Sequence, residues 1–173
     1  MKIAYTMAPG RGDTDRLLFR VAEALVAKGY RACGTVQINT EREVNDPCDM
    51  DVKVLPQGTV LRISQDLGPH ARGCRLDADA LETAVGLVAA TLNEGADFVI
   101  INKFGKHEAE GRGFRDVIAE ALALEIPVLV GTNGLNVDAF QEFTDGYAQE
   151  IAPEFDSIEA WLTAMIKANK DAA

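Results

Sequence analysis

Residues 7–14 have most of the spacing of a loop that binds phosphate groups. A P-loop has the pattern G-x-x-x-x-G-K-[ST] between a strand and a helix, and its backbone N–H groups and its lysine hold the phosphates. Gly12 and Thr14 match this pattern, whereas Met7 replaces the first glycine and Asp13 replaces the lysine. A glycine-rich turn between any strand and helix would look similar, so this loop alone favours neither interpretation.

A second stretch is rich in cations, although the chain as a whole is acidic. Residues 102–115 contain two glutamates and four basic side chains, Lys103, Lys106, Arg112 and Arg115. A helix is expected to begin nearby, and the free N–H groups at a helix N-terminus attract anions. Arg11 and Arg16 add cations from the first loop. Two interpretations stay open, namely an oxyanion or phosphate pocket and a solvated loop whose charges pair locally.

The elements expected around these loops alternate between strand and helix. Short apolar runs predict strands at 3–7, 32–38, 98–101 and 127–131. Apolar residues at helical spacing predict helices at 14–28, 77–93, 114–124, 136–143 and 157–169. This alternation is typical of an α/β fold with a doubly wound, mostly parallel sheet, which we expect to have about five strands. Ligands of such sheets bind beyond the carboxyl ends of the strands, where residues 8–14, 102–113 and 131–136 should meet.

Residues 39–76 interrupt the alternation and are interpreted as an insertion. Within it, 52–55 and 59–63 flank a Pro-Gln-Gly turn, which predicts a β-hairpin arm. Cys48 and Cys74 bracket the hairpin, with His70 nearby, but a metal site needs about four closely spaced ligands. No metal is therefore predicted, and we expect reduced thiols. The whole chain, 1–173, is interpreted as a single domain, because its length and its 47% apolar content suit one core.

Charge and hydropathy exclude several classes of protein. The net charge of -10 at pH 7 argues against nucleic-acid binding, which needs a basic surface. No apolar stretch approaches the roughly 18 residues of a membrane span. The N-terminus also lacks the apolar region and cleavage site of a signal peptide, so we expect a cytoplasmic protein. The sequence does not define the oligomeric state.

Both loops resemble those of the cancer-related nucleoside-triphosphatases. Residues 9–14 are similar to their Pro-Gly-x-Gly-Lys-Thr pattern, except at Asp13. Residues 102–108, Asn-Lys-Phe-Gly-Lys-His-Glu, are similar to their Asp-Glu-x-Gly-Lys-x-Glu motif, with matches at Gly105, Lys106 and Glu108. The resemblance implies a P-loop-like nucleotide-binding fold.

A closer resemblance covers nearly the whole chain. The phrases at 47–50, 63–68, 73–77 and 102–106 are similar to a family of uncharacterised bacterial proteins that are called nucleoside-triphosphatase-related. Genes of that family are often found near molybdate-transport genes. The resemblance therefore implies a link to molybdenum metabolism, but it implies no settled activity.

The departures from the nucleoside-triphosphatase motifs change sign together. Hydrolysis needs a cation on the β- and γ-phosphates and a carboxylate for magnesium. Asp13 stands at the position of the cation, and Asn102 and Lys103 stand at the acidic positions. Two unit charges about 4 Å apart interact by roughly 4 kcal/mol at an effective dielectric of about 20, so this reversal alters affinity greatly. We expect no hydrolysis, and we hypothesise that Asp13 pairs with Lys103 or Lys106.

Three functions stay open. The first is a non-hydrolytic protein that binds a small oxyanion, phosphate, nucleotide or molybdate at the strand edge. The second is a diverged nucleotide-dependent phosphotransferase or hydrolase in which Lys106 replaces the P-loop lysine. The third is a protein-interaction module with a vestigial cleft, and no catalytic residue is assigned in any of them. His107 is interpreted as a solvated loop residue, and the predicted ligand-binding residues are Gly10, Arg11, Gly12, Asp13, Thr14, Asn102, Lys103, Lys106, Arg112 and Asn133.

Overall fold

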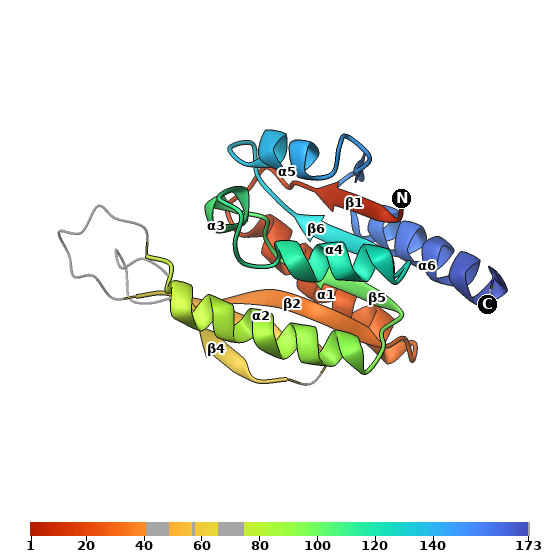
Figure 1. Ribbon diagram of the computed structural model, residues 1–173, viewed down its shortest axis with the longest axis horizontal. Coiled ribbons are helices and arrows are strands. Elements are labelled where there is room, and N and C mark those ends of the chain that lie inside the picture. The colour runs from red at the N-terminus through yellow and green to blue at the C-terminus, as the bar shows by residue number, and fades with distance from the viewer. Residues whose placement is uncertain (41–48, 57, 66–74, 173) are drawn as a thin grey trace.

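A seven-stranded sheet runs through the centre of the computed structural model, with helices on both of its faces (Figure 1). The structure describes residues 1–40, 49–56, 58–65 and 75–172. The strands are β1 (Ile3–Thr6), β2 (Ala32–Thr40), β3 (Asp49–Val54), β4 (Val60–Arg62), β5 (Phe98–Ile101), β6 (Val128–Gly131) and β7 (Gln149–Glu150). The helices are α1 (Asp13–Ala27), α2 (Ala78–Asn93), α3 (Lys106–Ala109), α4 (Arg115–Ala123), α5 (Val137–Phe143) and α6 (Phe155–Ala172).

The predicted doubly wound, mostly parallel sheet is confirmed. The strand order is β4-β3-β2-β5-β6-β1-β7, and the five strands from β2 to β7 in this order run parallel. Four of these parallel strands match predicted apolar runs. The fifth, β7, was not predicted, because two exposed residues are too few to show a periodic pattern.

The predicted hairpin exists, but it belongs to the sheet and does not stand away from it as an arm. β3 pairs antiparallel with β2 from Thr35 to Thr40, and β4 pairs antiparallel with β3. An unpaired edge of β2 would leave backbone N–H and C=O groups without partners, and β3 provides them. The hairpin thereby places the side chains of β3 beside the carboxyl end of β2.

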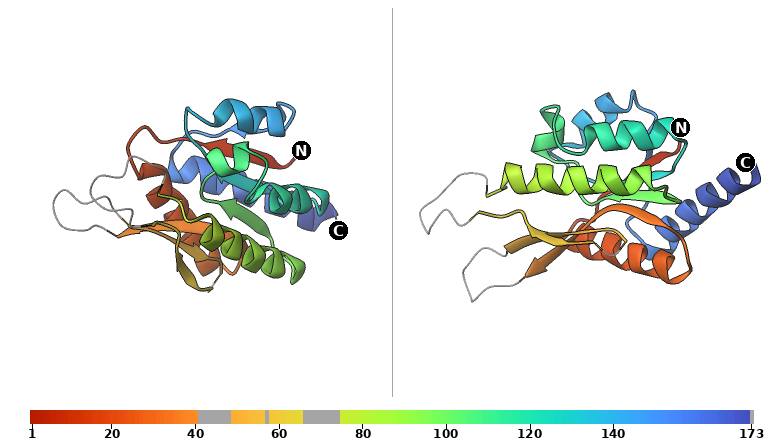
Figure 2. Two further views of the ribbon diagram at one scale, coloured as in Figure 1. Left: turned by 60° about the vertical axis from the view of Figure 1, so that its left-hand side comes forward. Right: turned by 60° about the horizontal axis from the view of Figure 1, so that its bottom comes forward.

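The two faces of the sheet build two separate cores. In β5, Val99 and Ile101 pack on the face of α2, α4 and α5, whereas Phe98 and Ile100 pack on the face of α1 and α6. Figure 2 shows α2 and α4 on one side of the sheet and α1 and α6 on the other. Burial on both faces explains why these strands appear in the sequence as continuous apolar runs. Among the described helices, none is long and apolar enough to cross a membrane.

Candidate functional site

Three loops meet at the edge where the parallel strands end, after β1, β5 and β6. A cleft of about 670 Å³ opens among them and extends toward β3 and α2. Six of the predicted ligand-binding residues line it, namely Arg11, Gly12, Asn102, Lys103, Lys106 and Asn133. The lining does not include the other predicted residues, Gly10, Asp13, Thr14 and Arg112. The structure therefore brings one part of the predicted set together and leaves the other part outside the cleft lining.

The first loop is closed by its own hydrogen bonds. The backbone N–H of Ala8 donates to the Thr14 hydroxyl at 2.9 Å, and Gly12 leads into α1 with φ of 76°. A left-handed φ at this position favours glycine, which explains this part of the motif. A Cβ on Gly10 would lie 1.9 Å from a carboxylate oxygen of Asp13, so that carboxylate packs directly over the loop.

Asp13 does not pair with a lysine of the second loop. Its carboxylate forms an ion pair with Arg16, one turn further along α1. Lys106 pairs with Glu110 instead, at 3.6 Å. The hypothesis that Asp13 pairs with Lys103 or Lys106 is therefore wrong, because partners within one helix turn are available to the charges concerned.

Asn102 ties the end of β5 to its neighbours. Its side chain is 3% exposed, and its Oδ1 accepts a hydrogen bond from the backbone N–H of Gln37 at 2.9 Å. Its Nδ2 donates to a carboxylate oxygen of Asp15, also at 2.9 Å. This amide uses both its donor and its acceptor, which a carboxylate at the same position could not do.

Asp15 and Gln37 line the cleft, although neither was among the predicted site residues. For Gln37, the pairing of β2 with β5 explains its place at the cleft. Thr35 pairs with Ile101, so Gln37 lies alongside the residues that follow β5. Asp15 lies in the first turn of α1, directly after Asp13 and Thr14, the last two positions of the P-loop-like pattern.

A buried glutamate and a buried histidine fix the second loop. Glu108 is 3% exposed, and its carboxylate accepts hydrogen bonds from the backbone N–H groups of Gly105 at 2.9 Å and Phe114 at 3.4 Å. His107 is 7% exposed and lies 2.8 Å from a carboxylate oxygen of Glu82 on α2. The interpretation of His107 as a solvated residue is therefore wrong. The sequence did not reveal this contact, because Glu82 is distant in the chain.

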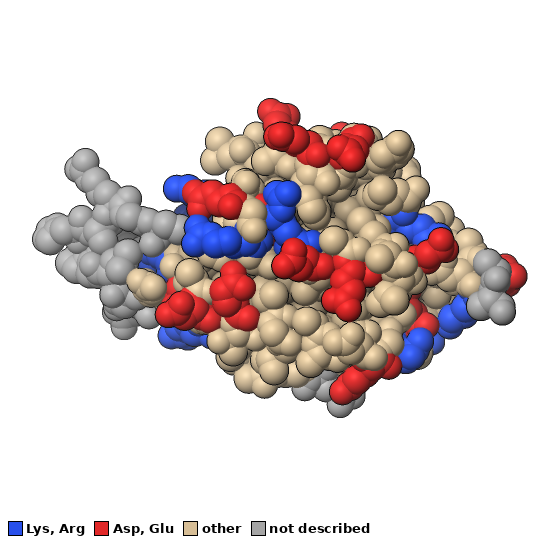
Figure 3. Space-filling model, in the orientation of Figure 1, with Lys and Arg blue, Asp and Glu red and all other residues tan. Residues whose placement is uncertain are grey.

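The cations of the first two loops differ in their partners. Arg112 hydrogen-bonds to Glu110 at 2.6 Å, and this bond, together with the charge of Lys106, holds the pKa of Glu110 below its ordinary value. Within the part of the chain that the structure describes, neither Arg11 nor Lys103 forms an ion pair. On the face shown in Figure 3, basic side chains gather beside α3 with carboxylates among them.

The opposite wall of the cleft is apolar. It comes from β3 and β4 with their flanking residues, from α2 and from the start of α4. Its apolar members are Met50, Val52, Ile63, Leu76, Leu81 and Phe114, and Arg75, next to Leu76, also lines the cleft. The cleft thus joins a cationic side, built by loops, to an apolar side, built mainly by the hairpin and α2.

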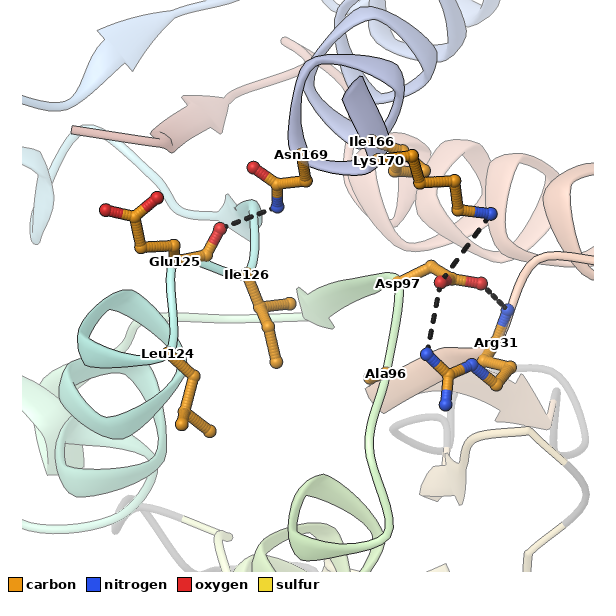
Figure 4. Close-up of a pocket in the computed structure, with 9 residues that line it drawn as sticks. All are labelled: Arg31, Ala96, Asp97, Leu124, Glu125, Ile126, Ile166, Asn169 and Lys170. Atoms are coloured by element: carbon orange, nitrogen blue, oxygen red, sulfur yellow. Dashed lines mark hydrogen bonds and ion pairs between the residues drawn. The ribbon is translucent and has the colours of Figure 1, made fainter. Parts of the chain in front are cut away.

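A second hollow, of about 440 Å³, lies at the other edge of the sheet (Figure 4). Its two cations, Arg31 and Lys170, both contact the carboxylate of Asp97, at 3.3 and 3.8 Å. Burial raises the pKa of Asp97, but the hydrogen bonds from Arg31 and the two positive charges outweigh burial and lower it. The amide of Asn169 donates to the backbone carbonyl of Glu125 at 2.8 Å. The two cations and this amide of the hollow therefore already have partners within the chain.

The thiols provide no reactive group within the described residues. Burial raises the pKa of the Cys33 thiol to about 12, and its sulfur lies 3.5 Å from the backbone carbonyl of Val88. Such a thiol stays protonated and packs as a small apolar group. Cys48, Cys74 and His70 lie outside the described residues, so the structure does not test their roles. No group of three potential metal ligands occurs among the side chains that the structure describes.

The strand order, the glycine loop before α1 and the cleft at the carboxyl edge define a P-loop-NTPase-like fold. The chain belongs to the family described as "Protein of unknown function (DUF2478)", whose model matches residues 3–161. The solution structure of a human cancer-related nucleoside triphosphatase is similar, with a TM-score of 0.59 and 18% identity over the whole of both chains. At this identity the likeness shows the shared fold alone.

A curated relative is considerably closer in sequence. The chain is 37% identical over 160 residues to the molybdenum import ATP-binding protein ModC 2 of Bradyrhizobium diazoefficiens. The match covers 92% of this chain but only 18% of the length of that protein. Both resemblances inferred from the sequence are therefore confirmed at the level of family and fold.

Proposed function

We propose that the cleft at the carboxyl edge binds a small oxyanion, a phosphate or a nucleotide without hydrolysing it. The observation that carries this proposal is the lack of ion pairs at two of the cations that line the cleft. Arg11 and Lys103 form none with a described residue, in a chain with a net charge of -10. An anion between them would supply the missing partner, and hydrogen bonds to charged groups are among the stronger ones in proteins.

The surroundings of the cleft argue against hydrolysis. Asn102 already donates to Asp15 and accepts from Gln37, and it carries no charge to hold magnesium. Glu108 accepts two backbone hydrogen bonds, so its carboxylate is already engaged as a structural group. Lys103 stands where the resembling family has a carboxylate, and a protonated amine cannot accept the proton of an attacking water.

Molybdate and ATP are the first ligands to test, because the name of the relative from Bradyrhizobium diazoefficiens mentions molybdenum import and ATP binding. The chain spans only 18% of that protein, so both ligands belong to the proposal. Molybdate and phosphate are both tetrahedral oxyanions that accept hydrogen bonds from Arg and Lys side chains. A shared anion site would accommodate either of them.

Thermal unfolding and titration calorimetry test the proposal directly. Phosphate, sulfate, molybdate, tungstate, ADP and ATP are compared with and without magnesium. A ligand that binds only the folded state raises stability by RT ln(1 + [L]/Kd). We expect Lys103→Ala to weaken binding about tenfold, which corresponds to about 1.4 kcal/mol. The matched control is Lys167→Ala, on the exposed side of α6, and it should change nothing. If none of the six anions binds, the proposal fails and the protein-interaction alternative is favoured.

A phosphate-release assay tests the absence of hydrolysis separately. The wild type is incubated with ATP and magnesium beside a Lys106→Ala variant. We expect equal, background release from both proteins. Magnesium-dependent release that the substitution abolishes would instead support the diverged hydrolase, with Lys106 as the cation on the phosphates.

A further inference from the structure

The size of the cleft exceeds the needs of a bare oxyanion. Its volume is about 670 Å³. Pockets of roughly 300–1,000 Å³ ordinarily enclose ligands of the size of a drug or a cofactor. A tetrahedral oxyanion consists of one central atom and its oxygens, so it would occupy only the cationic end. Most of the cleft would then hold water against an apolar wall.

The apolar wall has the properties of a recognition surface for a ring. Met50 and Leu76 line the cleft and are partly exposed, so they present apolar surface to it. Val52 on β3 and Leu81 on α2 are only 3% and 6% exposed, so each adds a small part of the wall and is held in place by the core behind it. Phe114, at the start of α4, is equally well buried. A flat ring placed on such a wall gains apolar contact, and the buried members of the wall need no further ordering.

The two walls face each other across the end of β2. In the sheet, β2 lies between β3, which carries Val52, and β5, which leads to Lys103. Thr35 and Gln37 of β2 line the cleft between the two walls. A single ligand can therefore reach from the cationic loops to the hairpin.

This inference rests on the proposed function and deepens it. We infer that the ligand is a phosphorylated compound with a flat heterocyclic ring. Its phosphate contacts Arg11 and Lys103, and its ring lies on the wall that contains Val52. The inserted hairpin thus supplies the part of the site that distinguishes this ligand from inorganic phosphate. Nucleotides and flavin mononucleotide share this chemistry.

A series of probes separates the contribution of the phosphate from that of the ring. Titration calorimetry compares inorganic phosphate, ribose 5-phosphate, adenosine, AMP, UMP and flavin mononucleotide on the full chain. We expect at least one of the three ring-bearing phosphates to bind at least tenfold more tightly than ribose 5-phosphate. Adenosine, which lacks the phosphate, should bind at least tenfold more weakly than AMP. The tightest of the three phosphates shows whether the ring is a purine, a pyrimidine or a flavin.

The matched variants Val52→Thr and Val60→Thr place the ring on the hairpin. Both exchange a methyl group for a hydroxyl on a strand, but Val52 lines the cleft, whereas Val60 on β4 is 52% exposed and does not. We expect Val52→Thr to weaken the tightest ring-bearing phosphate about threefold to fivefold. Its affinity for inorganic phosphate should stay unchanged, which also shows that the variant is folded. Val60→Thr should leave both affinities unchanged.

The outcomes distinguish failure of this inference from failure of the proposed function. If phosphate and all three ring-bearing phosphates bind with the same affinity, the inference is overturned while the anion site stands. The inference is also overturned if Val52→Thr and Val60→Thr have equal effects on ring-bearing ligands. If neither phosphate nor any phosphorylated probe binds, the proposed function itself fails, and the inference fails with it.

Discussion

At the amino edge of the sheet, Arg31 and Lys170 share the carboxylate of Asp97, whereas at the carboxyl edge Arg11 and Lys103 form no ion pair with a described residue. Both edges are hollowed, to about 440 and 670 Å³. The hollow at the amino edge has already used its polar groups, since Asn169 also bonds to the turn before β6. A ligand there would have to displace these contacts.

The difference shows that volume and charge do not by themselves indicate a binding site. What separates the edges is whether the chain supplies the partners of its own cations. At the amino edge, the turns entering β5 and β6 carry Asp97 and Glu125. At the carboxyl edge, the carboxylates of Glu82 and Glu108 accept hydrogen bonds from backbone N–H groups of the second loop, and Lys103 forms no ion pair with a described residue.

The largest expected difference between the two edges is the loss of phosphate affinity when the cations of each edge are removed. We expect Arg11→Ala/Lys103→Ala to weaken phosphate binding about 100-fold, which corresponds to about 2.7 kcal/mol. Arg31→Ala/Lys170→Ala at the amino edge should keep the affinity within about twofold, because those cations are already paired. Titration calorimetry measures both. Equal losses in the two double variants would remove the distinction between the edges.

Asn102→Asp should destabilise the carboxyl edge. The new carboxylate would lie beside Asp15, and we expect a loss of about 2 kcal/mol of unfolding free energy at pH 7. Like charges raise the pKa of the pair in the folded state, so the loss belongs to the ionised form and shrinks as the pH falls below about 5. Urea unfolding at several pH values measures this change.

The matched substitution Asn169→Asp places a carboxylate at the amino edge, beside the ammonium of Lys2. An opposite charge lowers the pKa of a carboxyl group, so this variant should gain relative stability as the pH rises through about 4. The two variants are therefore expected to have opposite pH dependences. The same sign in both would contradict the contrast between the edges.

Asp97→Asn should remove the central partner of the amino edge. We expect a loss of about 1 kcal/mol of unfolding free energy at pH 7, because Asp97 accepts hydrogen bonds from the backbone and guanidinium of Arg31. The pKa of Asp97 is lowered in the folded state, so its stabilisation is present above the unfolded pKa of about 3.9. It is lost as the pH falls through the folded pKa, and the wild type and the variant should converge there. A difference that stays constant down to pH 2 would contradict this assignment.

Asp13→Asn should have the smallest effect. The Asp13 carboxylate is 43% exposed and outside the cleft lining, so water screens its charge. Its loss frees Arg16, which does line the cleft, and we expect phosphate to bind about threefold more tightly. Weaker binding in this variant would mean that Asp13 orients Arg16 for the ligand. Calorimetry at low and high salt separates the two results.

Local patterns predicted most of the fold. The strands near 98–101 and 127–131 are buried on both faces, and such strands show as unbroken apolar runs. The two-residue β7 and the four-residue α3 are too short to show any period. The hairpin could be predicted from its turn, but its pairing with β2 depends on long-range hydrogen bonds.

The candidate site was predictable only in part, and for a similar reason. The glycines and cations of the first two loops point to an anion site through their types and spacing. Asp15 and Gln37 became part of it only because Asn102 joins β5 to both. The hypothesis of an Asp13–lysine pair failed because a sequence comparison shows which charges have changed, and it does not show which partners are nearer in space.

By itself, the sequence determined the α/β class, the edge of the sheet at which the loops meet, and the exchange of charges in both motifs. These properties follow from the spacing of apolar residues, from composition and from residue type, all of which can be read from short stretches of sequence. Only the tertiary structure decided which cations form no ion pair with a described residue, that His107 is buried against Glu82, and that the hairpin contributes apolar side chains to the cleft. Those properties depend on distances between segments far apart in the chain, which are set when the sheet and both helical layers pack together.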